Sequence, residues 1–203
     1  KQVEFYVRHM VIALNVIQTV HADVYPLPFF SLMTGGCMEK GLDVTWGGAR
    51  YNFTGPQAVG IANTADSLTA IDTLVFRQGK LTMAELLEAL NTNFEGREDL
   101  RQMLMLDAPK YGADDEYADS MMCYVGQTYA AAVNQYKDPR GGRYRAGLYS
   151  VPANVPLGLN VGALPDGRLA TTPLTDGVSP RHGVEKHGIT GVIKSAARID
   201  HVA

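Results

Sequence analysis

Cysteine is scarce in this sequence, with only two residues, Cys37 and Cys123, among 203. The two lie in different contexts and show no metal-ligand spacing, and such low cysteine use suits a reducing cytoplasm better than a disulfide framework. Long hydrophobic runs are also lacking, since no apolar stretch approaches the roughly 20 residues that a membrane span needs. We therefore expect a cytoplasmic protein that has no membrane partner.

The sequence has no large excess of positive or negative charge, and its formal net charge at pH 7 is −3. This balance predicts no nucleic-acid partner and no binding to an anionic membrane. The basic residues are scattered except for Arg140, Arg143 and Arg145, which could bind a substrate carboxylate through a bidentate fork. A solvated or structurally paired cluster is the commoner role for such a group, and we favour it here.

Several familiar catalytic and cofactor motifs are absent. The sequence has no Gly-x-Gly-x-x-Gly after a strand, no phosphate loop ending in Gly-Lys-Ser/Thr and no His-Glu-x-x-His. The five histidines show no ligand spacing, so we expect no metal site. Repeats and low-complexity linkers are also absent, which favours one domain over residues 1–203. The first residue is Lys and the last segment stops in mid-pattern, so we expect this domain to be partial, truncated at both ends.

What the sequence does contain is a glycine-rich stretch, Gly35 to Gly41, with Cys37 and Glu39 at its centre. The apolar run from Leu27 to Met33 precedes it and predicts a buried strand that delivers a short turn. Two glycines before the cysteine allow a positive φ or the close approach of another segment. In an extended tip the thiol and the carboxylate would share a face and could exchange hydrogen atoms and protons with a substrate. On these residues alone, a core-filling Cys37 and a solvated Glu39 are the favoured alternative.

Hydrophobic periodicity and capping signals predict a mixture of helices and strands, so the expected fold class is α/β. A largely buried helix is predicted from Glu4 to about Val24. A second helix is predicted to start at the capping box Thr54-Gly55-Pro56-Gln57 and to stop at Gly79, and a third runs from a capping box at Thr82 to about Phe94. The other predicted elements are an extended piece at 46–53, helices at 99–106, at 114–136 and from 189, one or two strands at 138–155, and a tight turn with local pairing of Asp166 and Arg168.

Short segments follow one another along the chain in an order that is informative in itself. They are Gly36-Cys37-Met38-Glu39, Gly47-Gly48-Ala49-Arg50-Tyr51-Asn52-Phe53, Gly55-Pro56-Gln57, Ile61-Ala62-Asn63, Asp66-Ser67-Leu68, Gly162 to Arg168 and Pro173 to Pro180. Together they resemble the glycyl radical enzymes related to pyruvate formate-lyase, and the resemblance covers most of the chain.

The resemblance implies a ten-stranded α/β barrel with a cysteine loop that reaches into its centre. Cys37 matches the cysteine that receives the radical from a glycine and then, as a thiyl radical, takes a hydrogen atom from a small-molecule substrate. The implied partners are a radical-SAM activating enzyme and a second copy in a homodimer, and no cofactor is bound directly. The glycyl radical motif, an Arg-Val-x-Gly-aromatic run, does not occur in these residues. The resemblance therefore implies a fragment that is inactive alone.

The neighbours of Cys37 narrow the implied reaction. Met38 stands where pyruvate formate-lyase has a second cysteine that carries an acetyl group, which argues against acyl transfer to coenzyme A. The Cys-x-Glu pattern resembles the eliminating members of the family (diol and glycerol dehydratases, choline lyase, hydroxyproline dehydratase), in which the counterpart of Glu39 is a general acid or base. The resemblance places Tyr51 and Asn52 at the substrate. Asn52 stands where glycerol-type dehydratases are expected to have aspartate, which argues against glycerol or propanediol.

The sequence therefore predicts a glycyl radical lyase, preferably a carbon–oxygen lyase that dehydrates a small hydroxylated compound. Two alternatives stay open. One is acyl transfer like that of formate C-acetyltransferase, which dependence on coenzyme A would reveal. The other is a non-catalytic barrel fragment or module.

Overall fold

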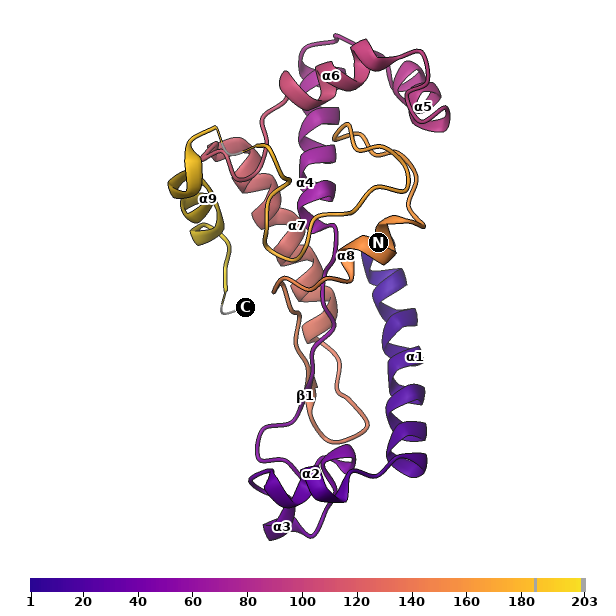
Figure 1. Ribbon diagram of the computed structural model, residues 1–203, viewed down its shortest axis with the longest axis vertical. Coiled ribbons are helices and arrows are strands. Elements are labelled where there is room, and N and C mark those ends of the chain that lie inside the picture. Colours follow the sequence, from indigo (N-terminus) through magenta and orange to yellow (C-terminus); the bar gives the residue numbers. More distant parts are fainter. Residues whose placement is uncertain (185, 202–203) are drawn as a thin grey trace. The chain divides into compact units, whose positions relative to one another are not determined.

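The computed structural model describes residues 1–184 and 186–201, which are mostly helical (Figure 1). They form two compact units. Unit 1 consists of Lys1–Pro56 and Thr128–Gly147, and unit 2 consists of Gln57–Gln127 with the chain from Leu148 onward. None of the helices in the described ranges is both long enough and apolar enough to cross a membrane.

Unit 1 combines a long helix with short helical segments and a pair of two-residue strands. Its helical segments are α1 (Gln2–Val24), α2 (Pro28–Met33), α3 (Cys37–Lys40) and the 3-10 turn η1 (Val44–Trp46). Helices α2 and α3 lie side by side (Figure 1). Strand β1 (Phe53–Thr54) pairs in parallel with β2 (Arg143–Tyr144). Val7 and Val11 of α1 pack against Tyr144 and the end of α7 (Glu116–Asn134) to form the hydrophobic core of this unit.

The α/β class is represented only weakly within the chain. Across the described residues, strand pairing is limited to β1 with β2 and one isolated bridge between Lys137 and Arg143. The predicted extended piece at 46–53 contributes only the first residue of β1, and the predicted strands at 138–155 contribute only β2 before the chain turns into α8 (Asn154–Gly158). The ten-stranded barrel is therefore not visible in this chain.

Helix α1 confirms the predicted helix, but the prediction that it is largely buried is wrong for this structure. Only Val7, Val11 and Ala22 of its 23 residues are buried, whereas Val16 and Ile17 are each 59% exposed. The reason is that unit 1 covers a single stripe of the helix, the stripe that meets the core.

Two further predictions for this part of the chain are wrong. The apolar run at 27–33 forms helix α2 rather than a strand, with Pro28 in the first turn, where a missing N–H leaves no helical hydrogen bond unmade. The helix predicted from Thr54 begins instead at Ile61, as α4 (Ile61–Ala70). Thr54 lies in β1, and its hydroxyl is within hydrogen-bond distance of the side chains of Gln18 and Asp138, so it is not free to cap a helix.

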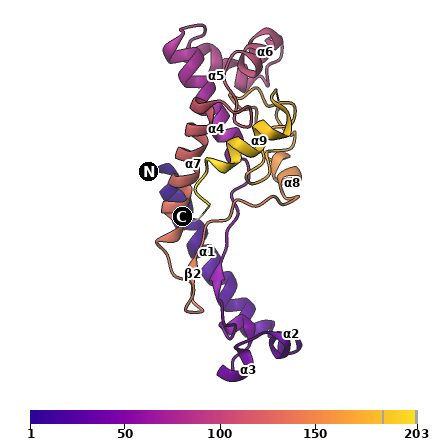
Figure 2. The same cartoon turned by 90° about the vertical axis from the view of Figure 1, so that its left-hand side faces the viewer.

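Unit 2 is built around α4, which lies beside the amino-terminal half of α7 in both views (Figures 1 and 2). Ile61 and Ala65 of α4 pack there against Met122 of α7. The capping box at Thr82 is confirmed, since Glu85 N donates to the Thr82 hydroxyl and Thr82 N donates to the Glu85 carboxylate. Apart from the helix expected from Thr54, the predicted helices are confirmed to within a few residues. The helical segments not yet given are η2 (Ile71–Arg77), a π-helical continuation of α4, and α5 (Met83–Asn91), α6 (Glu98–Leu106) and α9 (Gly188–Ala197).

The turn at 165–168 is confirmed, and the local pairing joins the Asp166 carboxylate to the Arg168 backbone. Arg168 N donates to Asp166 Oδ1 at 2.9 Å. The buried Arg168 guanidinium donates to backbone carbonyls, including those of Gly158, Gly162 and Thr172. Both side chains therefore hold the turn-rich segment together.

Asp66 of α4 is a carboxyl group in the core of unit 2. Its Oδ1 accepts a hydrogen bond from Tyr111 N at 2.8 Å, and its Oδ2 has no hydrogen-bond partner among the described residues. Burial raises the pKa of Asp66 to about 7, an effect that the hydrogen bond from Tyr111 N and the nearby Lys110 offset only in part. An unfolded aspartate has a pKa of about 3.9. Between about pH 4 and about pH 7 the folded state therefore holds a proton on Asp66 that the unfolded state has released. The stability of unit 2 should therefore fall as pH rises from about 4 to about 7.

Asp66→Asn is expected to remove this dependence on pH, because the amide keeps an oxygen for Tyr111 N but carries no charge. The measurement is the hydrogen-exchange protection of the α4 amides from pH 4 to pH 8, corrected for intrinsic exchange. Equal slopes in the wild-type protein and in Asp66→Asn would rule out Asp66 as the titrating group.

Candidate active site

Gly36 and Gly48, one from each glycine pair, pack backbone to backbone beside Cys37. Gly36 has a φ of +103°, and a Cβ placed on it would lie 2.6 Å from Arg50 N. A Cβ on Gly48 would lie 2.1 Å from Leu42 O and 2.9 Å from Cys37 Sγ. Both sites therefore require glycine, and the resulting enclosure leaves Cys37 only 3% exposed.

The extended tip predicted around Cys37 is wrong, because Cys37–Lys40 is the short helix α3. Gly36 in the left-handed conformation begins this helix, and Gly41 in the same conformation ends it. Positions two apart on a helix do not face each other. Cys37 is accordingly buried while Glu39 is exposed.

Glu39 is held by the start of its own helix. Its Oε2 accepts a hydrogen bond from Gly36 N at 2.9 Å, the side-chain half of a capping box. Hydrogen bonds from the backbone N–H groups of Glu39 itself and of Gly36 lower the pKa of this carboxyl below its ordinary value. Glu39 is therefore ionised at neutral pH.

A cavity of about 580 Å³ opens beside the cysteine. Most of its wall is apolar, and it is lined by Pro28, Phe29, Ser31, Leu32, Cys37, Met38, Gly41, Leu42 and Asp43. Of the four residues that the sequence placed at the site, only Cys37 is in this lining. Tyr51 is 84% exposed, and it lines a different hollow with Thr34 and Arg50.

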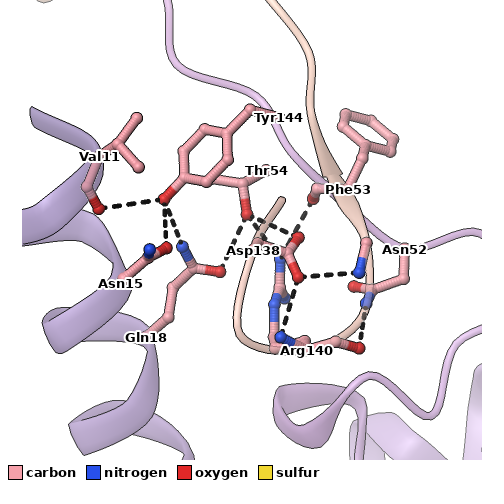
Figure 3. Close-up of polar contacts among 10 residues, drawn as sticks. Val11, Asn15, Gln18, Asn52, Phe53, Thr54, Asp138, Arg140 and Tyr144 are labelled. Atoms are coloured by element: carbon pink, nitrogen blue, oxygen red, sulfur yellow. Dashed lines mark hydrogen bonds and ion pairs between the residues drawn. The ribbon is translucent and has the colours of Figure 1, made fainter. Parts of the chain in front are cut away.

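Asn52 belongs to a polar network of unit 1 (Figure 3). Its Nδ2 donates to the backbone carbonyl of Arg140 at 3.0 Å. The Arg140 guanidinium lies 3.6 Å from the Asp138 carboxylate and donates to Phe53 O at 3.2 Å. These contacts confirm that Arg140 is structurally paired. Asn52 is fixed by its hydrogen bond to Arg140 O in the turn before β2.

Sequence reasoning missed Asp43, whose carboxylate collects four hydrogen bonds. Oδ1 accepts from Thr45 N at 2.9 Å and from Thr45 Oγ1 at 2.6 Å, while Oδ2 accepts from Ser31 Oγ at 2.7 Å and from Leu27 N at 3.1 Å. The Thr45 hydroxyl first, followed by the other donors, lowers the pKa of Asp43 to about 2. The local signal was available, since Asp-x-Thr is typical of a turn in which the aspartate caps the next backbone amides.

Metal binding has no support in the part of the chain that the structure describes. No three His, Cys, Asp or Glu side chains of those residues gather closely enough to hold an ion. The polar side chains that line the cavity beside Cys37 are those of Ser31 and Asp43.

Solved structures resemble this chain in fold. A glycyl radical enzyme from Archaeoglobus fulgidus is similar with a TM-score of 0.90 and 43% identity over 98% of this chain and 25% of its own. The hydroxyproline dehydratase of Clostridioides difficile, solved with trans-4-hydroxy-L-proline bound, is similar with a TM-score of 0.93 and 39% identity over 99% of this chain and 26% of its own. The fold is therefore that of the glycyl radical enzymes.

Sequence comparison agrees. The (2S)-3-sulfopropanediol dehydratase of Klebsiella oxytoca is 37% identical over 99% of this chain and 25% of its own length. Residues 1–158 match the model of the family described as pyruvate formate lyase-like. The chain belongs to the pyruvate formate lyase-like family, as the ordered segments along the chain predicted. It spans about a quarter of the length of the curated relatives that it matches.

Proposed function

We propose that this chain carries the cysteine loop of a glycyl radical lyase that dehydrates a small hydroxylated compound or expels a related leaving group. The observation that carries the proposal is the burial of Cys37, which is only 3% exposed, beside the close backbone packing of Gly36 and Gly48. A thiyl radical must be shielded from water and other thiols, and a buried sulfur with a fixed backbone around it meets that need. Relatives that are named dehydratases match almost the whole chain.

The proposed reaction begins when the Cys37 thiyl radical takes a hydrogen atom from a hydroxyl-bearing carbon, which leaves an S–H group and a carbon radical. A hydroxyl beside a carbon radical is more acidic, and Glu39 as the base takes its proton. The neighbouring hydroxide then leaves and departs as water with the proton from Glu39. The product radical finally takes the hydrogen atom back from the Cys37 S–H group, which restores the thiyl radical.

The wider proposal concerns the intact protein. The 203 residues form one partial domain of a ten-stranded barrel, with Tyr51 and Asn52 near the substrate. A glycine radical on another segment supplies the thiyl radical, and a radical-SAM enzyme generates it. The intact protein works as a cytoplasmic homodimer and binds no further cofactor.

An anaerobic assay of the intact, activated protein tests this function. The panel contains diols, hydroxyprolines, choline-like amines, and pyruvate with and without coenzyme A. The proposal predicts loss of water or a related group from a hydroxylated compound without coenzyme A. If pyruvate were the one compound of the panel to react, and reacted only with coenzyme A present, the reaction would be acyl transfer instead. Met38 supplies no second thiol to carry the acyl group. A full radical signal with no turnover of any substrate would support a non-catalytic module.

Glu39→Gln is expected to lower turnover by about 100-fold or more, the usual contribution of a general base. Glutamine keeps the shape and an oxygen for Gly36 N but cannot accept the substrate proton. The measurement is product formed per glycyl radical, so that differences in activation cancel. Glu88→Gln, on an exposed carboxylate of α5, is the matched control. Wild-type turnover in Glu39→Gln would remove Glu39 from the mechanism.

A further inference from the structure

We propose that Asp43 is the positioning residue that holds the Cys37 sulfur at its working place. The inference rests on the proposed function, in which this sulfur abstracts hydrogen. It concerns a residue that does not itself touch the reacting atoms but fixes the segments that do.

Asp43 joins the chain on either side of the cysteine loop. One oxygen of its carboxylate receives Leu27 N and Ser31 Oγ, from the start of α2, and the other receives both donors of Thr45 in η1. Among the ion pairs of the described residues, none involves Asp43. The charge is therefore stabilised by four convergent donors, which fix its geometry more tightly than one mobile cation would.

The backbone of the same residue leads directly to the sulfur. Gly48 N donates to Asp43 O at 3.0 Å, and Gly48 is the glycine whose Cβ would meet Cys37 Sγ. The preceding residue is tied as well, because Leu42 N donates to Cys37 O at 3.1 Å. Ser31 and Asp43 both line the cavity beside Cys37. Asp43 thus fixes both the backbone at Gly48, which contacts the sulfur, and part of the lining of the cavity beside Cys37.

An asparagine cannot replace this carboxylate. Asp43 accepts at both oxygens, whereas the asparagine amide has one oxygen and one NH2 group. Whichever way the amide turns, its NH2 group faces one backbone N–H and one hydroxyl. The hydroxyl can turn and accept from the NH2 group, but the hydrogen bond from the backbone N–H is lost and two N–H groups face each other. The loop would then relax around Cys37 even where the overall fold persists.

The test uses the intact, activated protein and compares Asp43→Asn with wild type. We expect turnover per glycyl radical to fall by about 100-fold, the cost of a misplacement of about 1 Å at a reacting atom. The KM should stay within about twofold, because the proposed role of Asp43 is to place the sulfur and not to bind the substrate. The deuterium isotope effect for substrate labelled at the abstracted position should rise, since hydrogen abstraction becomes the slower step. A merely structural role would lower the folded, radical-bearing fraction and leave turnover per radical and the isotope effect unchanged.

Two variants complete the design. Thr45→Val removes only the 2.6 Å hydroxyl donor to Asp43. It should lower turnover per radical by about tenfold, with the same direction of change in the isotope effect. If Asp43→Asn does not fold, this variant tests the positioning role in its place. Asp23→Asn, on an exposed residue of α1, should behave as wild type. Unchanged turnover per radical in the Asp43 and Thr45 variants, with Cys37→Ser inactive, overturns the positioning role alone. An active Cys37→Ser overturns the proposed function together with it.

Discussion

Gly48→Ala is expected to lower turnover per glycyl radical by about 100-fold or more, because it displaces the Cys37 sulfur. The new Cβ would lie 2.1 Å from Leu42 O, 2.8 Å from Leu42 C and 2.9 Å from Cys37 Sγ. The first two are backbone atoms, so no side-chain rotation relieves the contact and the loop must move. Overpacking of this kind also costs about 1–3 kcal/mol of stability.

Gly35→Ala is the matched control within the same motif. A Cβ on Gly35 would meet nothing within 4 Å, so this variant should keep wild-type turnover and thermal stability. Activity and radical content are measured in the same anaerobic sample, and unfolding is followed separately. Normal turnover in Gly48→Ala, or an equal loss in Gly35→Ala, would contradict the close packing described around Cys37.

The glycine pairs show what could be predicted from sequence and where prediction stopped. Glycine before a cysteine indicates positive φ or close approach, and Gly36 shows both, whereas Gly48 in the second glycine pair shows the close approach. The contacting atoms could not be predicted, because they belong to Arg50 and Leu42 and depend on the tertiary fold. The family was nevertheless recognisable, since the order of such segments depends on the sequence alone.

The two capping boxes show how long-range contacts override a local signal. The box at Thr82 forms as predicted, with partners three residues apart. The box at Thr54 does not, because Gln18 and Asp138, which are 36 and 84 residues away, engage its hydroxyl. Nothing in the local sequence distinguishes the two cases.

The cysteine loop was misread because short apolar runs do not distinguish a strand from a helix by periodicity. Pro28 in the first turn of α2 and the donors from Leu27 and Ser31 to Asp43 favour the helix. Of these features, only the position of Pro28 can be seen in the local sequence.

Asp43 likewise combines a local and a distant signal. Its Asp-x-Thr turn is a local pattern, but its hydrogen bonds to α2 span 12 and 16 residues.

Cys37→Ser is expected to abolish turnover, the largest effect in this account. Serine is close to cysteine in size, but an O–H bond is much stronger than an S–H bond, so a glycyl radical cannot take its hydrogen atom. The glycyl radical itself forms on another segment in the proposed mechanism and should persist. Loss of activity with the radical retained is therefore the signature of this variant, and a folding defect would lower both.

Cys123→Ser supplies the control for thiol chemistry in general. Cys123 is half-buried in α7, and its Sγ lies 3.2 Å from Arg198 O, a contact that a serine hydroxyl can keep. This variant should retain wild-type turnover.

The most direct measurement is product formed per glycyl radical, by spin quantification and assay of the same activated sample, for wild type, Cys37→Ser and Cys123→Ser. The account predicts a full radical signal in all three proteins and no product from Cys37→Ser. Product formation by Cys37→Ser at the wild-type rate per radical would contradict it.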